Sequence, residues 1–184
     1  FVLMLEVKTM LSFLFKDYQR AAAMIVFISF ATLSAALISQ YVFGLNPCEL
    51  CIYQRIPYVF TIAFGLVAYG AARQDKSIAK FFMILAGITF LVGAGIAAFH
   101  VGVEQKWWEG LTSCGGSSND AEMTLEELRQ LVLSSPVVRC DEVAWSLFGV
   151  SMAGYNALLS FALAIYSFIS LTKDKEDIED STDE

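Results

Sequence analysis

The sequence predicts an all-α membrane protein built as a bundle of four transmembrane helices. Of its 184 residues, 57% are hydrophobic and only 17% are charged, whereas about a quarter of the residues in an ordinary soluble domain are charged. The apolar residues gather in four stretches, each close to the roughly 20 residues that a helix needs to cross a bilayer. The net charge of -7 comes without a basic cluster, so we expect no nucleic-acid partner. The expected organisation is one membrane domain, residues 1–184.

The four spans are expected at about 21–43, 53–72, 81–101 and 147–171. The first contains 23 residues without a charge and is longer than the ~7–15-residue apolar region of a cleaved signal peptide. The second is uncharged only from Ile56, unless the preceding CIYQR segment extends it. A proline inside a helix removes a hydrogen bond. Pro57 therefore either kinks a helix that begins at Cys48 or lies at the start of a helix that begins at Ile56.

The basic residues predict which side of the membrane each connection occupies. They precede the first span and fill the connection between the second and third: Lys8, Lys16, Arg20, Arg73, Lys76 and Lys80. Positive charge marks the cytoplasmic side, so we expect both termini, including the acidic tail 172–184, to be cytoplasmic. The connections 44–55 and 102–146 then face outward, and the first of them carries a single basic residue, Arg55.

The second outward connection contains a helix signature, MTLEELRQLVL at 123–133. Thr124 and Glu127 stand at the spacing of a capping box. Leu125, Leu128 and Val132 share one face, so we expect a short amphipathic helix. It either lies on the outer leaflet and holds the cysteines of this connection near the first one, or simply covers the bundle.

All four cysteines fall in the two outward connections: Cys48 and Cys51 in the first, Cys114 and Cys140 in the second. Three interpretations compete. Two inert disulfides would staple the connections, as is common outside the bacterial cytoplasm. A zinc site would use the Cys-x-x-Cys pair, but the second pair is too widely spaced for a four-cysteine knuckle. Redox exchange fits best, because two intervening residues are typical of a reactive dithiol.

The surroundings of the first pair favour redox chemistry. Cys48 and Cys51 stand where the second helix begins, and the N–H groups and dipole of a helix N-terminus stabilise a thiolate. Arg55 lies four residues after Cys51 and therefore on the same helix face. An arginine at the bilayer edge also occurs without any function, with its charged head extended toward water.

Three features together resemble the DsbB family of membrane disulfide-generating proteins. They are CELCIYQR at the start of the second span, FHVGVEQKWWEG at the end of the third, and the distant pair Cys114 and Cys140. The resemblance extends from about Arg20 to Leu171. It implies a multi-pass protein of the bacterial inner membrane, with its cysteines on the periplasmic side. The implied activity is oxidation of a soluble, thioredoxin-fold DsbA-like dithiol, with electrons passed to a lipid-dissolved quinone, either ubiquinone or menaquinone.

The resemblance also implies a role for each site residue. Cys114 forms the mixed disulfide with the partner, and the released Cys140 attacks Cys48. Cys51 is thereby freed as a thiolate beside the quinone, where Arg55 stabilises charge. A histidine at the position of His100 is associated with the quinone site, although a lone interfacial histidine is more often a simple hydrogen-bonding residue. No metal is expected in this relay.

Other functions remain open from the sequence. A DsbB paralogue would serve a different thiol partner. Proteins similar to vitamin K epoxide reductase also couple thiols to quinones, but their Cys-x-x-Cys lies in a late span, unlike Cys48. A non-catalytic membrane scaffold would use the same cysteines only as structural disulfides.

Overall fold

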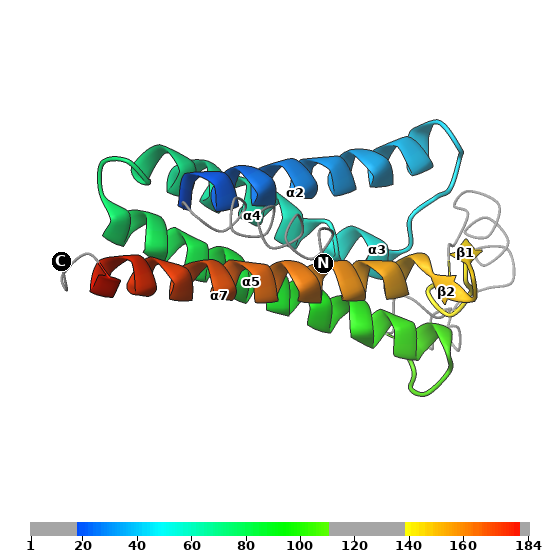
Figure 1. Cartoon of the computed structure of the whole chain (residues 1–184). Helices are drawn as coiled ribbons and strands as arrows, with labels where there is room; N and C mark the ends of the chain where they lie inside the picture. Colours follow the sequence, from blue (N-terminus) through cyan, green and yellow to red (C-terminus); the bar gives the residue numbers. More distant parts are fainter. Residues whose placement is uncertain (1–17, 111–138, 181–184) are drawn as a thin grey trace, which may run out of the picture.

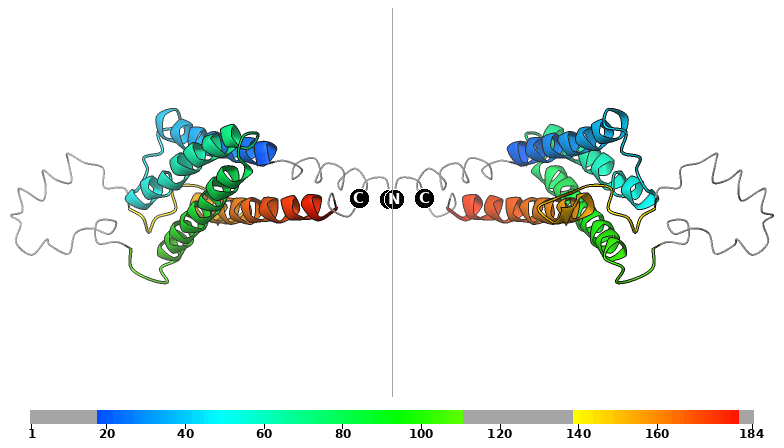
Figure 2. Two further views of the ribbon diagram at one scale, coloured as in Figure 1. Left: turned by 90° about the vertical axis from the view of Figure 1, so that its left-hand side faces the viewer. Right: turned by 90° about the vertical axis from the view of Figure 1, so that its right-hand side faces the viewer.

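The computed structural model describes residues 18–110 and 139–180, with side chains described as far as residue 172. Four long helices dominate this part of the chain: α2 (Tyr18–Tyr41), α4 (Ile56–Ala71), α5 (Lys76–Glu104) and α7 (Met152–Asp180). A short helix, α3 (Glu49–Tyr53), precedes α4. The long helices pack in chain order, α2 on α4, α4 on α5 and α5 on α7 (Figure 1; Figure 2). The predicted four-helix bundle is confirmed.

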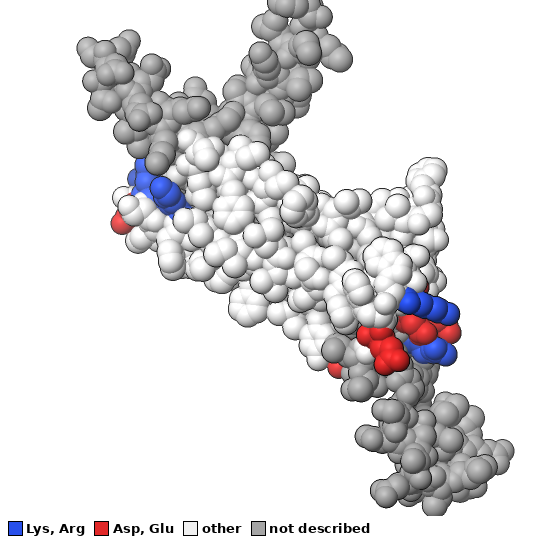
Figure 3. Space-filling view, turned by 90° about the horizontal axis from the view of Figure 1, so that it is seen from below, with Lys and Arg blue, Asp and Glu red and all other residues white. Residues whose placement is uncertain are grey.

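The surface of the bundle is that of a membrane protein. Four helical segments of the described chain are long and apolar enough to cross a bilayer when α3 and α4 are counted together as Glu49–Ala71. Only 22–33% of the residues in their apolar windows are buried. Large side chains such as Phe27 and Phe81 point outward instead, which favours contact with lipid. The described charges gather at the two ends of the molecule, with an uncharged band between them (Figure 3).

The connections between helices fall at two opposite ends of the bundle. One end holds the start of α2, the α4–α5 connection and the C-terminal part of α7 (Figure 1). The exposed Arg73, Lys76 and Lys80 belong to this end. The opposite end holds the α2–α3 connection, α3 and the segment that precedes α7. The described parts of the two predicted outward connections therefore meet at one end.

The second span consists of two helices separated by a break. α3 ends at Tyr53 and α4 begins at Ile56, with Arg55 as the N-cap residue. Pro57 stands in the first turn of α4, where its missing N–H is not needed by the helix. A Cβ atom built at Gly93 of α5 would lie 3.2 Å from Pro57 Cβ, so the two helices approach closely at the proline. Of the two possibilities the sequence left open, the structure has Pro57 at a helix start.

The fourth span was expected from residue 147, but α7 begins at Met152. The residues before it form an antiparallel hairpin of β1 (Ser146–Leu147) and β2 (Val150–Ser151). Phe148 and Gly149 connect the strands with φ values of 50° and 78°, as expected for a type I′ turn. Apolar composition does not reveal such a turn, so the expected span began too early. α7 also continues into the expected acidic tail.

The interior of the bundle combines apolar packing with a few buried hydroxyls. Ile25, Met83 and Phe90 are fully buried in the main core. Ser29 of α2 and Thr61 of α4 are also fully buried, and their hydroxyl oxygens lie 3.0 Å apart. Such a hydrogen bond satisfies two polar groups that lipid could not satisfy.

Candidate active site

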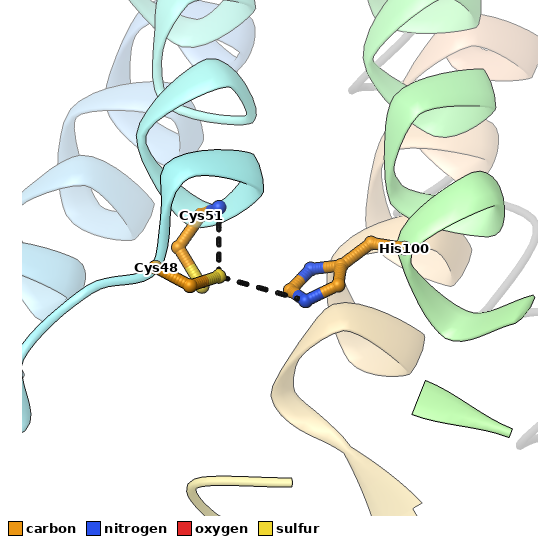
Figure 4. Close-up of side chains that lie close together, drawn as sticks. All are labelled: Cys48, Cys51 and His100. Carbon is orange, nitrogen blue, oxygen red and sulfur yellow. Dashed lines mark hydrogen bonds between the residues drawn. The ribbon is translucent and has the colours of Figure 1, made fainter. Parts of the chain in front are cut away.

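Cys48 and Cys51 lie at the first turn of α3 (Figure 4). Cys48 is the N-cap residue, and its sulfur accepts a hydrogen bond from the backbone N–H of Cys51 at 3.3 Å. The two Sγ atoms are 2.7 Å apart, and both cysteines are free thiols. Cys48 is buried and Cys51 is half-buried. The two-residue spacing thus places both sulfur atoms side by side at one end of the bundle.

The two thiols do not share their surroundings equally. The hydrogen bond between the Cys48 thiol and Cys51, together with burial, raises the pKa of Cys48 well above its usual range. A raised pKa means that the neutral form is favoured. Cys48 therefore stays protonated at neutral pH in the reduced pair.

His100 approaches the pair from the last turn of α5. Its Nε2 atom lies 3.6 Å from Cys48 Sγ (Figure 4) and 3.9 Å from Glu104 Oε1. Its Nδ1 atom lies 2.7 Å from Gln54 Nε2. The ring is only 3% exposed, so water has little access to either nitrogen. His100 is thus a direct neighbour of the dithiol.

Cys140 joins the pair from the connection between α5 and β1. Its side chain is 1% exposed and packs in one cluster with Cys48, Leu50 and Val103, against which Cys51 also packs. The structure therefore brings together three of the four cysteines singled out in the sequence. Cys114 and the amphipathic helix expected at 123–133 lie outside the described residues, so both stay predictions.

Arg55 occupies the break between α3 and α4. Its Nη1 donates to Gln40 Oε1 at 2.6 Å and its Nη2 to the Ala36 carbonyl at 3.5 Å. Both acceptors belong to α2. Cys51 and Arg55 would share a face only if one helix ran through both. The helix is instead broken between Tyr53 and Ile56, and these two residues both line one cavity.

This cavity has a volume of about 270 Å³ and lies among α2, the α3–α4 break, the end of α5 and the start of α7. Its polar wall includes Cys51, Arg55 and His100, and its apolar wall includes Ala36 and Leu159. Ligand pockets typically measure about 300–1,000 Å³, so this cavity is at the small end of the range. A larger groove of about 580 Å³, between α4 and α5, is almost wholly apolar and carries none of the cysteines.

The same side chains offer metal-ligating atoms. Within the described ranges, one donor atom each from Cys48, Cys51 and His100 lie within 4.8 Å of one another. Two thiolates and an imidazole suit zinc. The zinc interpretation therefore has a donor set different from the four-cysteine set considered in the sequence.

Several polar residues near the site were not predicted from the sequence. Gln54 receives a hydrogen bond from Asn156 Nδ2 at its Oε1 atom, over 2.6 Å. Tyr58 donates to Asn156 Oδ1 at 2.5 Å. Ser151 donates to the Glu104 carboxylate at the far side of His100. The available signal was Asn156, a lone amide in an otherwise apolar span, because such residues usually have a partner within a membrane bundle.

The fold and the site together define a class of protein. It is a multi-pass membrane protein that holds a close pair of thiols, a third cysteine and a histidine at one end of a helix bundle. The family model described as Disulfide bond formation protein DsbB matches residues 18–170, and the chain belongs to this family. It is therefore a membrane protein of disulfide bond formation, in the class of disulfide-forming oxidoreductases.

Individual relatives match over most of their length. Disulfide bond formation protein B of Saccharophagus degradans is 34% identical over 143 residues, which cover 74% of this chain and 83% of that protein. The protein of the same name from Xanthomonas axonopodis pv. citri is 32% identical over 153 residues, covering 80% and 87%. An uncharacterized protein of Rickettsia prowazekii is 30% identical over 158 residues, covering 85% and 90%.

Proposed function

We propose that this chain is a thiol:quinone oxidoreductase that reoxidises a periplasmic DsbA-like protein and passes the electrons to a membrane quinone. The observation that supports it best is the placement of Cys140 in one buried cluster with Cys48, whose partner Cys51 lines the cavity. Disulfide exchange requires a thiolate close to a disulfide sulfur, and this packing provides the proximity. Overall, one partner dithiol loses two electrons and two protons, and one quinone gains them to become a quinol.

The relay starts from two disulfides, Cys114–Cys140 and Cys48–Cys51. A partner thiolate attacks Cys114, which forms a mixed disulfide and releases Cys140 as a thiolate. Cys140 then attacks Cys48, so that a Cys48–Cys140 bond forms and Cys51 leaves as a thiolate. The second thiol of the partner attacks the mixed disulfide, which releases the oxidised partner and frees Cys114.

The return of the relay restores both disulfides. Cys114 attacks Cys140, which re-forms their bond and releases Cys48. The dithiol of Cys48 and Cys51 then closes to a disulfide as its two electrons and two protons pass to the quinone. Each thiol exchange conserves electrons, and the only net oxidation occurs at the pair beside the cavity.

The residues around the cavity fit a quinone ring. A bound quinone would supply a two-electron acceptor with carbonyl oxygens that take up negative charge as it is reduced. Arg55 offers N–H donors to such oxygens, His100 lines the same polar wall, and Ala36 and Leu159 offer apolar contacts to a ring face. The cavity is too small to hold a long isoprenoid tail in addition to the ring. α2 packs mainly on α4 and α7 mainly on α5, so we expect the ring to enter between α2 and α7, with the tail left in the lipid.

The proposal includes a location and an orientation. We assign the protein to the bacterial inner membrane, with both termini in the cytoplasm and the cysteine end in the periplasm. Support comes from Arg73, Lys76 and Lys80, which lie at the end opposite the cysteines. The oxidising periplasm is also the compartment in which a disulfide relay would meet its thiol partner.

The test is a reconstituted reaction in liposomes under anaerobic conditions, with the full chain, a quinone and a reduced DsbA-like partner. We expect the partner to be oxidised only when quinone is present, and a Cys51→Ser variant to lose this activity. Oxidation that needs no quinone, or that survives Cys51→Ser, would contradict the proposal. Quinone-dependent oxidation of a different thiol protein alone would identify a paralogue.

Two further outcomes would identify the competing functions. Stoichiometric zinc in the chain as purified, lost in Cys48→Ser, would support a metal site instead of a redox site. Cysteines that are reduced mildly and are not reoxidised by added quinone would support a scaffold with structural disulfides.

A further inference from the structure

A chain of polar side chains connects α7 and α4 to His100. The Tyr58 hydroxyl donates to Asn156 Oδ1, Asn156 Nδ2 donates to Gln54 Oε1, and Gln54 Nε2 contacts His100 Nδ1 at 2.7 Å. Gln54 and Tyr58 are 6% and 3% exposed. Within the described ranges, no buried side-chain nitrogen or oxygen lacks a hydrogen-bond partner. The orientation of each group therefore depends on its neighbours and not on water.

A backbone carbonyl sets the direction of the hydrogen bonds in this row of side chains. Gln54 Nε2 also lies 3.3 Å from the Leu50 carbonyl oxygen, which can only accept a hydrogen bond. The reverse orientation of the Gln54 amide would bring two oxygen atoms together there. At the far end, Asn156 Oδ1 accepts from Tyr58 and Ser160, which leaves Asn156 Nδ2 to donate to Gln54. Both side-chain amides, of Asn156 and Gln54, thus donate in the direction of His100.

This direction determines where the imidazole carries its proton. Gln54 Nε2 is a donor, so His100 Nδ1 must accept, and a neutral ring then has its proton on Nε2. Cys48 Sγ lies 3.6 Å from that nitrogen and Glu104 Oε1 lies 3.9 Å from it, and the backbone of Cys140 also hydrogen-bonds to the ring. We propose that Gln54 and Asn156 are positioning residues that hold His100 as the Nε2–H tautomer, with its proton directed at the Cys48 sulfur.

The consequence for the relay rests on the proposed function. Cys48 is the sulfur that Cys140 attacks, and it is also the sulfur released when Cys114 recaptures Cys140. A released sulfur leaves more readily when hydrogen bonds stabilise its negative charge. The Cys48 sulfur already accepts from the Cys51 backbone N–H, and the fixed His100 tautomer provides a second donor. With the proton on Nδ1, His100 would instead turn a lone pair toward Cys48.

The chain contains a single histidine, so ¹⁵N-histidine labelling gives one ring to observe. The full chain, reduced and reconstituted in lipid, is examined by NMR correlations that distinguish Nδ1 from Nε2 through their couplings to the ring protons. We expect a protonated Nε2 and an unprotonated Nδ1 in the wild-type chain. Gln54→Glu places a carboxylate, which can only accept, beside Nδ1, so Nδ1 should become protonated. Gln54→Leu should give a mixture of tautomers.

Ser29→Ala is the matched control, because it removes a buried hydrogen bond between α2 and α4 outside this chain of side chains. It should leave the His100 spectrum unchanged. A wild-type ring protonated at Nδ1, or a Gln54→Glu spectrum identical to that of the wild type, would overturn the inference. The wild-type spectrum alone suffices for this decision if a variant fails to fold.

Turnover provides a second, separate measurement. Gln54→Leu should lower the rate of quinone-dependent turnover by about tenfold, as is typical when a group that orients a functional histidine is removed. Gln54 also lines the cavity, so the rates are compared at saturating quinone. An unchanged rate would overturn the role in the relay. The NMR measurement needs neither quinone nor partner, so the tautomer assignment is decided even if the proposed oxidoreductase activity is absent.

Discussion

Arg55 is the residue with the clearest expected effect on the proposed chemistry. Its guanidinium lines the cavity and is held by Gln40 and the Ala36 carbonyl. It stays charged at any working pH. A charge fixed in this way, beside a half-buried thiol, can stabilise both a departing thiolate and a quinone oxygen that gains negative charge.

We predict that Arg55→Ala inserts and folds but that its quinone-dependent turnover falls by a factor of about 10²–10³, as expected for the loss of one preorganised donor. Arg55→Lys should recover part of the rate, because a point charge replaces the planar fork. Exchange among the cysteines should survive in both variants. The measurement is turnover against quinone concentration, with cysteine redox states followed by alkylation. Arg73→Ala, at the other end of the bundle, is the control. Wild-type kinetics in Arg55→Ala would show that this arginine only extends its charge toward water at the bilayer edge.

The raised pKa of Cys48 predicts an unusual pH dependence. A free thiol titrates near ~8.5, and the folded environment favours the protonated form above that value. The stabilisation is therefore fully present below pH ~8.5 and is lost as the pH rises through the higher folded pKa. In the reduced chain, alkylation of Cys48 should stay slow beyond the pH at which an ordinary thiol becomes reactive. Peptide mapping after timed alkylation measures this, and a midpoint near the ordinary value would contradict it.

The sequence could predict the residues whose chemistry is carried by local spacing. Cys48, Cys51 and Arg55 stand out because they occur together in one short segment. His100 stands out because it is the only histidine. Gln54 and Asn156 could not be paired in the same way. They are far apart in the sequence and meet only because α4 and α7 both pack against α5.

At the scale of elements, the approach of α5 to the α3–α4 break positions the site. Pro57 at the start of α4 packs against Gly93, where a Cβ atom would also lie 3.7 Å from Ser160 Oγ of α7. Gly93 thus lets three helices approach one another closely. The sequence left this break open, because Pro57 fits either a kink within a helix or the start of one.

We predict that Gly93→Leu destabilises the bundle by about 1–3 kcal/mol, the usual cost of overpacking a core. Gly95→Leu is the matched control on the same helix, because nothing lies within 4 Å of a Cβ atom built there. The two variants gain similar helix propensity, so their difference reports the contact with Pro57. Thermal unfolding in one detergent measures both. Equal midpoints would contradict the close approach of α4 and α5.

Charged residues lie at both ends of the molecule, with an uncharged band between them on the face drawn in Figure 3. Arg73, Lys76 and Lys80 lie at the end opposite the cysteines. This arrangement could be predicted from the sequence because span length and basic residues are both visible in it. The hairpin before α7 could not, since its turn depends on backbone dihedral angles at Phe148 and Gly149. The predicted helix at 123–133 stays a prediction, because it lies outside the described residues.

We predict that a membrane-impermeant thiol reagent, applied to intact spheroplasts after reduction, labels all four cysteines. The buried Cys48 and Cys140 should react most slowly. A reporter fused after Lys173 should be active only in the cytoplasm. The control is a cysteine introduced at Arg73 in a cysteine-free background, which should react only after the membrane is permeabilised. A reporter that is active outside would overturn the assigned orientation.

The central claim is that Cys140 passes the exchange from the outer connection to Cys48. The most direct measurement uses the fully oxidised chain and a partner variant that keeps only its attacking cysteine, so that the relay stops after its second step. Free thiols are then alkylated and the disulfides mapped by mass spectrometry. We predict a Cys48–Cys140 disulfide, with Cys51 as the alkylated cysteine of the chain. An alkylated Cys140 beside an intact Cys48–Cys51 disulfide would contradict the account.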